Sequence, residues 1–177
     1  MNTKLRATIL LASAAFASFS HAANAADGTI NFTGTVIAEA CTVSTASASQ
    51  TVALGNVSAK AFPAVGATAM PAKFDITLTS CPDSVTKALV KFDGPFAENN
   101  TNLLALTTET GVATGLGIAI YEADGTTLIP MTAPSAQKAV TKGVNPVFSY
   151  IAKYMSTNAT VTTGPANAVT QFSISYN

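Results

Sequence analysis

The sequence is poor in the side chains that most often carry chemistry. It contains no tryptophan, a single histidine (His21) and a single arginine (Arg6), and 10% of its residues are charged. Catalysis of the Ser–His–Asp or Cys–His kind needs a histidine base, and nucleic-acid binding needs a basic patch. His21 and Arg6 both lie in a leader described below, so the rest of the chain lacks all three residue types. This excludes histidine-based catalysis, leaves only a lysine or carboxylate base, and predicts neither an enzyme nor a nucleic-acid-binding protein.

Residues 1–25 have the three-part pattern of a secretory signal peptide. Lys4 and Arg6 precede the apolar run ATILLASAAFASFS, and the small residues of SHAANA follow it. Cleavage after Ala25 and cleavage after Ala22 both fit the pattern, and an uncleaved membrane anchor is the alternative. Removing residues 1–25 turns nine basic residues into seven against nine acidic ones. We therefore expect an exported protein with a small negative net charge.

Two cysteines, Cys41 and Cys81, remain in the exported chain. In an oxidising compartment an even pair of cysteines predicts a disulfide. A redox-active or metal-binding pair is the alternative, but C-x-x-C spacing and histidine partners are missing from the sequence. The acidic residues are scattered, and the sequence offers neither the ligand spacing of a calcium loop nor a phosphate loop. We expect a structural disulfide, no metal and no cofactor.

Short segments with alternating apolar and polar residues recur along the chain, separated by turn residues, which predicts half-buried strands. In KFDITLTSC, for example, we expect Phe74, Ile76 and Leu78 to point inward, and Asp124-Gly125 is typical of a hairpin turn. Many short strands within about 150 residues predict one β-sandwich or barrel domain. The expected strands lie within residues 28–41, 51–57, 73–81, 88–94, 101–107, 115–130 (a hairpin), 146–155 and 168–176.

The last residues, VTQFSISYN, continue this alternation almost to the end of the sequence. Phe172, Ile174 and Tyr176 fall on one face, and polar residues fall on the other. A patterned strand in this position is unusual, because most domains end in a few loose polar residues.

The segment DGTINFTGTV, at the start of the exported chain, alternates in the same way. Gly28, Ile30 and Phe32 share one face, and Val36 falls on the same parity. An ordinary edge strand of the domain's own sheet is one interpretation of this segment. A strand that pairs with another molecule is the other.

Several stretches of the sequence are similar to one family. GTINFTGTVIAEAC looks like an opening donor segment that leads to a first cysteine, and VALGNV and FDITLTSC look like the next strands and the second cysteine. YIAKY and GPANAVTQFSISYN look like closing strands, with Gly164 fourteenth and Tyr176 second from the end, where this family carries a glycine and an aromatic residue. Over essentially its whole exported length the chain resembles the major pilin subunits of chaperone–usher fimbriae, the type 1 fimbrial protein family.

This resemblance implies an all-β fold, an incomplete immunoglobulin-like β-sandwich that lacks its final strand and is completed by a donor strand from a neighbouring subunit. It implies a signal peptide at 1–25, an N-terminal donor-strand segment at 26–37 and a pilin domain at 38–177. The site residues it implies are a disulfide between Cys41 and Cys81, a donor face of Gly28, Ile30 and Phe32, and a groove-lining, chaperone-contacting C-terminal strand with Gly164, Phe172, Ile174 and Tyr176.

The function implied by the resemblance is that of a structural subunit of a surface fimbria, which polymerises by donor-strand exchange after chaperone-assisted folding and supports cell adhesion. Its expected partners are identical or related pilin subunits, a periplasmic chaperone, an outer-membrane usher and a tip adhesin or adaptor. We expect export through the periplasm to the cell surface. A minor or adaptor pilin and a glycan-binding adhesin domain of the same system are alternatives, and an exported enzyme is a third.

Overall fold

The computed structural model describes residues 27–34, 36 and 40–177. The chain divides into two units, residues 1–36 and 37–177, and each is described by itself. The expected signal peptide and its cleavage site lie outside the described residues, so they stay predictions, as do the expected domain boundaries. Within the described part of the chain, no helix has the length and apolar character needed to cross a membrane.

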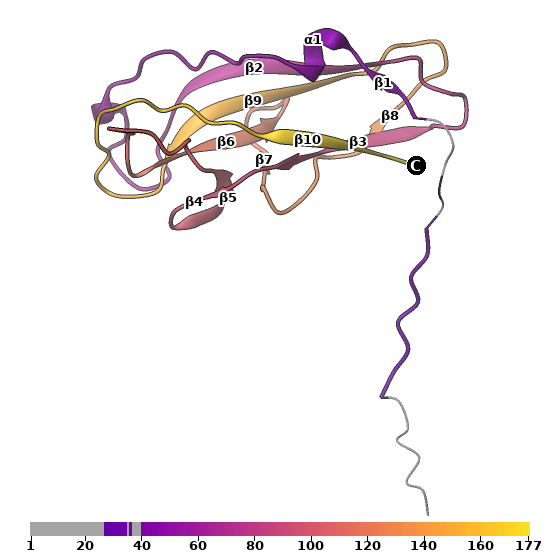
Figure 1. The fold of residues 1–177 in the computed structure, drawn as a ribbon, viewed down its shortest axis with the longest axis horizontal. Helices are drawn as coiled ribbons and strands as arrows, with labels where there is room; N and C mark the ends of the chain where they lie inside the picture. The colour runs from indigo at the N-terminus through magenta and orange to yellow at the C-terminus, as the bar shows by residue number, and fades with distance from the viewer. Residues whose placement is uncertain (1–26, 35, 37–39) are drawn as a thin grey trace, which may run out of the picture. The chain divides into compact units, whose positions relative to one another are not determined.

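Residues 40–177 form two β-sheets, and nearly all regular structure in them is strand (Figure 1). The larger sheet has the order β1-β2-β9-β6-β5-β4, with β7 paired to β6, and the smaller has the order β10-β3-β8. All the strand pairs are antiparallel. The elements are β1 (Thr42–Val43), α1 (Thr45–Ala48), the 3-10 helix η1 (Ala59–Ala61), β2 (Thr68–Thr79), β3 (Lys87–Asp93), β4 (Phe96–Ala97), β5 (Asn100–Leu104), β6 (Leu116–Glu122), β7 (Leu128–Ile129), β8 (Lys138–Ala139), β9 (Val147–Ser156) and β10 (Gln171–Tyr176).

The core lies between the two sheets and follows the predicted alternation. Ile76 and Leu78 of β2 are fully buried, and Phe74 is partly buried against them. Phe74, Tyr150 of β9 and Phe92 of β3 form an aromatic cluster with ring centroids 5.1–6.0 Å apart. Since Phe92 comes from the small sheet and the other two rings from the large one, these edge-to-face contacts join the sheets.

A buried hydroxyl pair adds a polar link between the sheets. Tyr150 donates to the Ser135 Oγ over 3.1 Å, and the Val90 amide of β3 donates to the same oxygen over 3.0 Å. Ser135 also donates its own amide to the Val90 oxygen. Ser135, in the loop before β8, therefore hydrogen-bonds to the backbone of Val90 in the middle of β3, as a neighbouring strand would.

The hairpin predicted around Asp124-Gly125 is confirmed by the pairing of Tyr121 in β6 with Leu128 in β7. Gly125 adopts a positive φ of 68°, a conformation that glycine reaches without a steric penalty. The Asp124 carboxylate accepts the Thr126 and Thr127 amides and the Thr127 hydroxyl, and these bonds hold the pKa of Asp124 well below its usual range. The turn residues therefore fold this hairpin locally.

The strand predicted at residues 51–57 is wrong. The segment belongs to no strand, although Val52, Leu54 and Val57 pack against the core as the alternation indicates. The physical reason is that no strand in the described part of the chain receives its backbone groups. The other differences are smaller: β2 begins at Thr68 and not at 73, and β10 begins at Gln171 and not at 168. The short elements β1, α1, η1, β4 and β8 were not expected.

Candidate functional site

The strand β10 has one paired edge and one open edge. It pairs with β3 from Gln171 opposite Asp93 to Tyr176 opposite Ala88, and no second strand is paired with it among the described residues. Asn177 and Lys87 exchange both of their backbone hydrogen bonds. Because directly bonded pairs alternate along an antiparallel ladder, the backbone groups of residues 171, 173 and 175 also face β3. Those of residues 172, 174 and 176 face the open edge.

The three residues whose backbone faces the open edge also carry the inward side chains of β10. Phe172, Ile174 and Tyr176 are partly buried and pack against the core, whereas Gln171, Ser173 and Ser175 are exposed. The structure thus places the three predicted C-terminal residues together. Their side chains point into the core, and their backbone N–H and C=O groups, which have no strand partner among the described residues, point outward along the open edge of the small sheet. Such an edge is a template for another strand.

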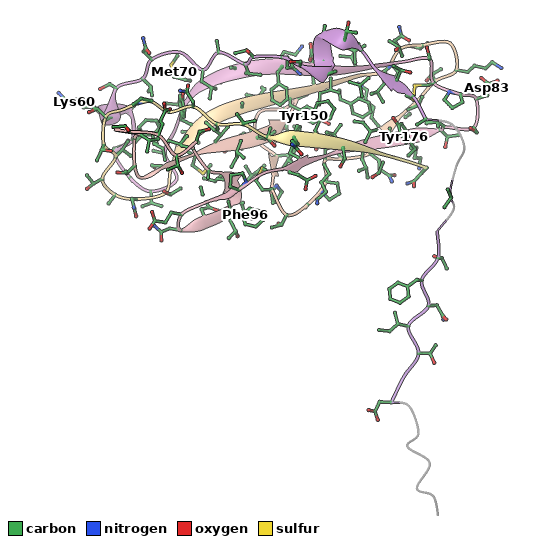
Figure 2. All side chains as sticks on the ribbon, in the orientation of Figure 1. Lys60, Met70, Asp83, Phe96, Tyr150 and Tyr176 are labelled. Atoms are coloured by element: carbon green, nitrogen blue, oxygen red, sulfur yellow. A yellow bond between two sulfur atoms is a disulfide. The ribbon has the colours of Figure 1, made fainter. Side chains whose placement is uncertain are left out.

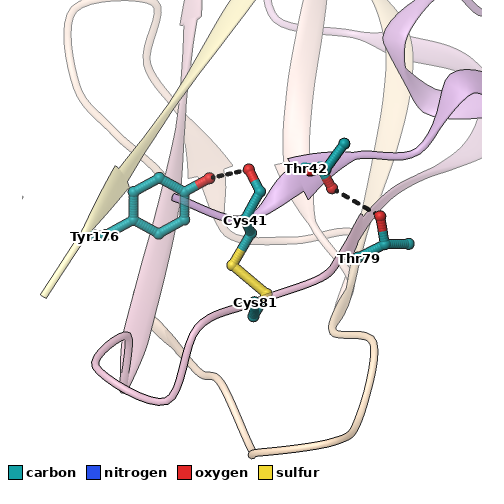
Figure 3. The surroundings of a disulfide bond; sticks show 5 residues. All are labelled: Cys41, Thr42, Thr79, Cys81 and Tyr176. Carbon is teal, nitrogen blue, oxygen red and sulfur yellow. Dashed lines mark hydrogen bonds between the residues drawn. A yellow bond between two sulfur atoms is a disulfide. The ribbon is translucent and has the colours of Figure 1, made fainter. Parts of the chain in front are cut away.

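The far end of β10 is fastened beside the disulfide (Figure 3). The Tyr176 hydroxyl donates to the Cys41 main-chain oxygen over 3.2 Å, and Cys41 is bonded to Cys81, so the predicted disulfide is confirmed. Burial raises the pKa of Tyr176, against the opposing effect of this hydrogen bond. Closing a loop of 40 residues stabilises the fold by about 4 kcal/mol on the chain-entropy account.

The segment 51–57 is a second place where backbone groups lack partners among the described residues. Within the described residues, no backbone hydrogen bond joins it to another segment. Its apolar side chains and those of β10 pack against the same core cluster. Among the described residues, the sandwich therefore presents the open edge of β10 and the unpaired backbone of 51–57 against one apolar core cluster.

A cavity of about 400 Å³ lies where residues 55–62 approach residues 161–167. Tyr154 of β9 lines it and donates its hydroxyl to the Ala166 oxygen over 3.1 Å, and burial raises the pKa of Tyr154. Phe62, Ala113 and Leu116 supply apolar parts of the lining. Sequence patterns gave no signal for the contact between Tyr154 and Ala166, because the loop that carries Ala166 has no period of its own.

Gly164 lines this cavity, away from the other predicted residues of the C-terminal strand. A Cβ on Gly164 would lie 2.0 Å from the Gly111 oxygen and 2.7 Å from the Ala113 nitrogen. The Ala113 amide also donates to the Pro165 oxygen over 2.9 Å. Two backbones therefore approach so closely here that only glycine fits, which is a physical reason for the residue at this position.

The predicted donor residues lie in the other unit of the chain. Residues 27–34 form no helix or strand, and the side chains of Ile30 and Phe32 are 79% and 92% exposed. Nothing within 4 Å would meet a Cβ added at Gly28. Within residues 27–34, the alternating apolar side chains therefore lie exposed and pack against no other part of this stretch. Among the described residues, no group of three or more His, Cys, Asp or Glu is placed to hold a metal ion.

Comparison with known proteins gives the family. The family model described as fimbrial protein matches residues 30–177. The chain belongs to the fimbrial protein family. It is 40% identical to the probable major fimbrial subunit LpfA of Escherichia coli O157:H7 over 88% of this chain and 86% of that one. It is 37% identical to the type-1 fimbrial protein, A chain, of Salmonella typhi over 99% and 97%.

Solved structures agree with the fold of this fimbrial subunit. A Burkholderia pseudomallei antigen and type I fimbria protein aligns with a TM-score of 0.60 at 35% identity, over 84% of this chain and 97% of that one. The P pilus rod subunit PapA aligns with a TM-score of 0.65 at 24% identity, over 78% and 100%, which bears on the fold alone. The predicted all-β, immunoglobulin-like sandwich is confirmed.

Proposed function

We propose that this protein is a structural subunit of a surface fimbria, and that the donor-strand segment 26–37 of one copy completes the sandwich of the next. The observation that carries the proposal is the open edge of β10. The residues whose backbone groups face this edge also point their apolar side chains into the core, and the segment 51–57, whose backbone has no partner among the described residues, packs on the same core cluster. A single inserted strand satisfies both backbones and covers the core, which is recognition by strand addition.

The inserted strand runs antiparallel to β10 in this proposal, like every other pair in the two sheets. Placing Ile30 opposite Ile174 puts Phe32 opposite Phe172 and Gly28 opposite Tyr176. Residues directly opposite each other share a face, so the donor's apolar side chains then point into the core. In this register Val36 lies opposite residue 168, next to the residues 161–167 that line the cavity.

The exposed donor face supplies the driving force. Full burial of Ile30 and of Phe32 contributes about 1.5–3 kcal/mol each, and the new backbone ladder adds further stabilisation. Gly28 meets the Tyr176 ring in the proposed register, where a side chain of any size competes with that ring for space. Gly28→Leu should therefore slow polymerisation without unfolding the subunit, and a normal yield of fibres would contradict this role.

The partners follow from the same edge. An open, apolar-flanked edge promotes aggregation, so the subunit needs a periplasmic chaperone that covers β10 until a donor strand replaces it. An outer-membrane usher, a tip adhesin or adaptor, and transit through the periplasm to the surface complete the proposal. Support for a shaft subunit comes from the relative LpfA, which is named a probable major fimbrial subunit. An adaptor subunit is the second candidate, and abundance in sheared fibres separates the two.

Two chains test the proposal. One begins at Ala38, after the donor segment, and the other is the same chain with ADGTINFTGTVIA attached by a flexible linker after Asn177. We expect a soluble monomer with a high midpoint of thermal unfolding only for the second chain. Equal yield and equal midpoints for both would mean that the sandwich is complete without a donor, and the proposal would fall.

A further inference from the structure

Met70 has a backbone conformation that is rare for a residue with a long side chain. Its φ is +56°, in the left-handed region, and Pro71 follows it. The two residues form a bulge in β2, where the register to β9 shifts between Ala69 and Ala72. Strained conformations of this kind persist where the surrounding structure enforces them, and they gather at functional sites.

The bulge directs Met70 toward the segment 51–57. A Cβ added at Gly55 would lie 3.0 Å from the Met70 Cε, so the methyl group rests against the Gly55 backbone. Gly55 lines the 400 Å³ cavity together with Asn56 and Val57, whereas Met70 is outside the lining. Figure 2 shows Met70 toward the end of the folded unit that carries Lys60, away from Asp83 and Tyr176. Met70 therefore touches the cavity only through Gly55.

The bulge is also connected to the cavity through Ala69, the residue before Met70. Ala69 pairs with Tyr154, which lines the cavity and is hydrogen-bonded to Ala166. The bulge thus adjoins one wall through Gly55 and another through Tyr154. The segment 51–57 has no backbone bonds to other described segments that would fix its distance from the core. The distance between this segment and the core is therefore set by side-chain contacts, such as the contact of Met70 with Gly55.

We propose that Met70 is a positioning residue that braces Gly55 and so limits the size of the donor side chain that the cavity accepts. The inference rests on the proposed strand insertion, in which Val36 is the donor residue nearest the cavity. Met70 is 37% exposed, so its side chain contacts Gly55 without being part of the buried core. Its effect should appear in the choice between donor strands more than in the stability of the subunit.

The test uses the full chain without its signal peptide, refolded with fluorescent peptides of residues 27–37 that carry Val36, or Phe in its place (Val36→Phe). Association is followed by anisotropy. We expect the unchanged chain to favour the Val36 peptide by about tenfold in rate, the discrimination that a fitted apolar pocket typically achieves. Met70→Gly and Met70→Ala should both bring this ratio close to one.

The two variants separate positioning from stability. Met70→Gly relieves the left-handed strain and should keep or raise the Tm, whereas Met70→Ala keeps the strain, loses the contact and should lower it. Met155→Ala is the matched control, because Met155 is a partly buried methionine of the second small core cluster, and it should keep the ratio.

The positioning role is overturned if the ratio of the two association rates rises and falls with the Tm of the variants. It is also overturned if Met70→Gly leaves this ratio unchanged. Binding of neither peptide by the unchanged chain overturns strand insertion itself. The failure of the inference and the failure of the proposed function therefore give different results.

Discussion

The Tyr176 hydroxyl is hydrogen-bonded to the main-chain oxygen of Cys41 across 135 residues of sequence, at 3.2 Å. The bond fastens the last strand at the point where the disulfide fastens the first (Figure 3). The end of β10 is thus fixed on its β3 side and at its tip, while its other edge stays open. A groove that must hold its shape without its final strand needs such an anchor.

Tyr176→Phe should remove this anchor and leave the ring in place. We expect the free energy of unfolding to fall by about 0.5–1.5 kcal/mol, the net worth of one hydrogen bond. Urea unfolding followed by circular dichroism measures it. Tyr121→Phe is the control, because no hydrogen bond of the Tyr121 hydroxyl occurs within the described residues. An equal effect of both changes would show that the bond to Cys41 does not stabilise the fold.

Gly164→Ala should disturb both the fold and the cavity. Its Cβ would lie 2.0 Å from the Gly111 oxygen, a backbone atom that cannot swing away. We expect a loss of about 1–3 kcal/mol, as for other overpacked sites, and slower donor association. Gly143→Ala meets no atom within 4 Å and has a φ of +73°, so it should show only the cost of left-handed backbone, about 1 kcal/mol. Thermal unfolding of the two variants decides the matter, and a smaller loss for Gly164→Ala would contradict the close approach.

Ser135→Ala should break the polar link between the sheets. It leaves the Tyr150 hydroxyl and the Val90 amide buried without their partner, at a cost of about 1–3 kcal/mol. Ser173→Ala, on the exposed face of β10, should change stability by less than about 0.5 kcal/mol. Urea midpoints measure both variants. A neutral Ser135→Ala would mean that these groups find other partners.

Alkaline pH should destabilise the subunit. Burial raises the pKa of all four tyrosines, and that of Tyr150 reaches about 12 against an ordinary value of 10.0. The unfolded chain then loses these protons first, so the stability is fully present below about pH 10 and is lost as the pH rises toward about 12. Absorbance at 295 nm should show phenolate appearing together with unfolding. Ionisation near pH 10 in a chain that stays folded would contradict the burial.

The sequence alone was enough to predict the main strands and their inward faces, because alternation reports directly which side of a strand is buried. Phe172, Ile174 and Tyr176 are where that pattern puts them. The same pattern misjudged 51–57, since burial of Val52 and Leu54 says nothing about whether a neighbouring strand is present. Whether a strand is paired depends on which other segments lie beside it in the folded sheet, and the alternation within one segment does not report that.

Other features of the site lay beyond sequence patterns for a related reason. The close approach of Gly164 to Gly111, the bulge at Met70 and the bond from Tyr154 to Ala166 all join segments that are far apart or irregular. Two-residue strands such as β4 and β8 are too short to show a period. Of these residues, Gly164, Tyr154 and Ala166 line the cavity.

Amide hydrogen exchange along β10 tests the central claim most directly. In the monomer with β10 free, the amides of residues 173 and 175 should be protected by β3, and those of residues 172, 174 and 176 should exchange quickly. Adding a peptide of residues 27–37, or assembly into fibres, should protect the second set without changing the first. Protection of all five amides before any donor is added, or unchanged exchange of residues 172, 174 and 176 in the fibre, would contradict the account.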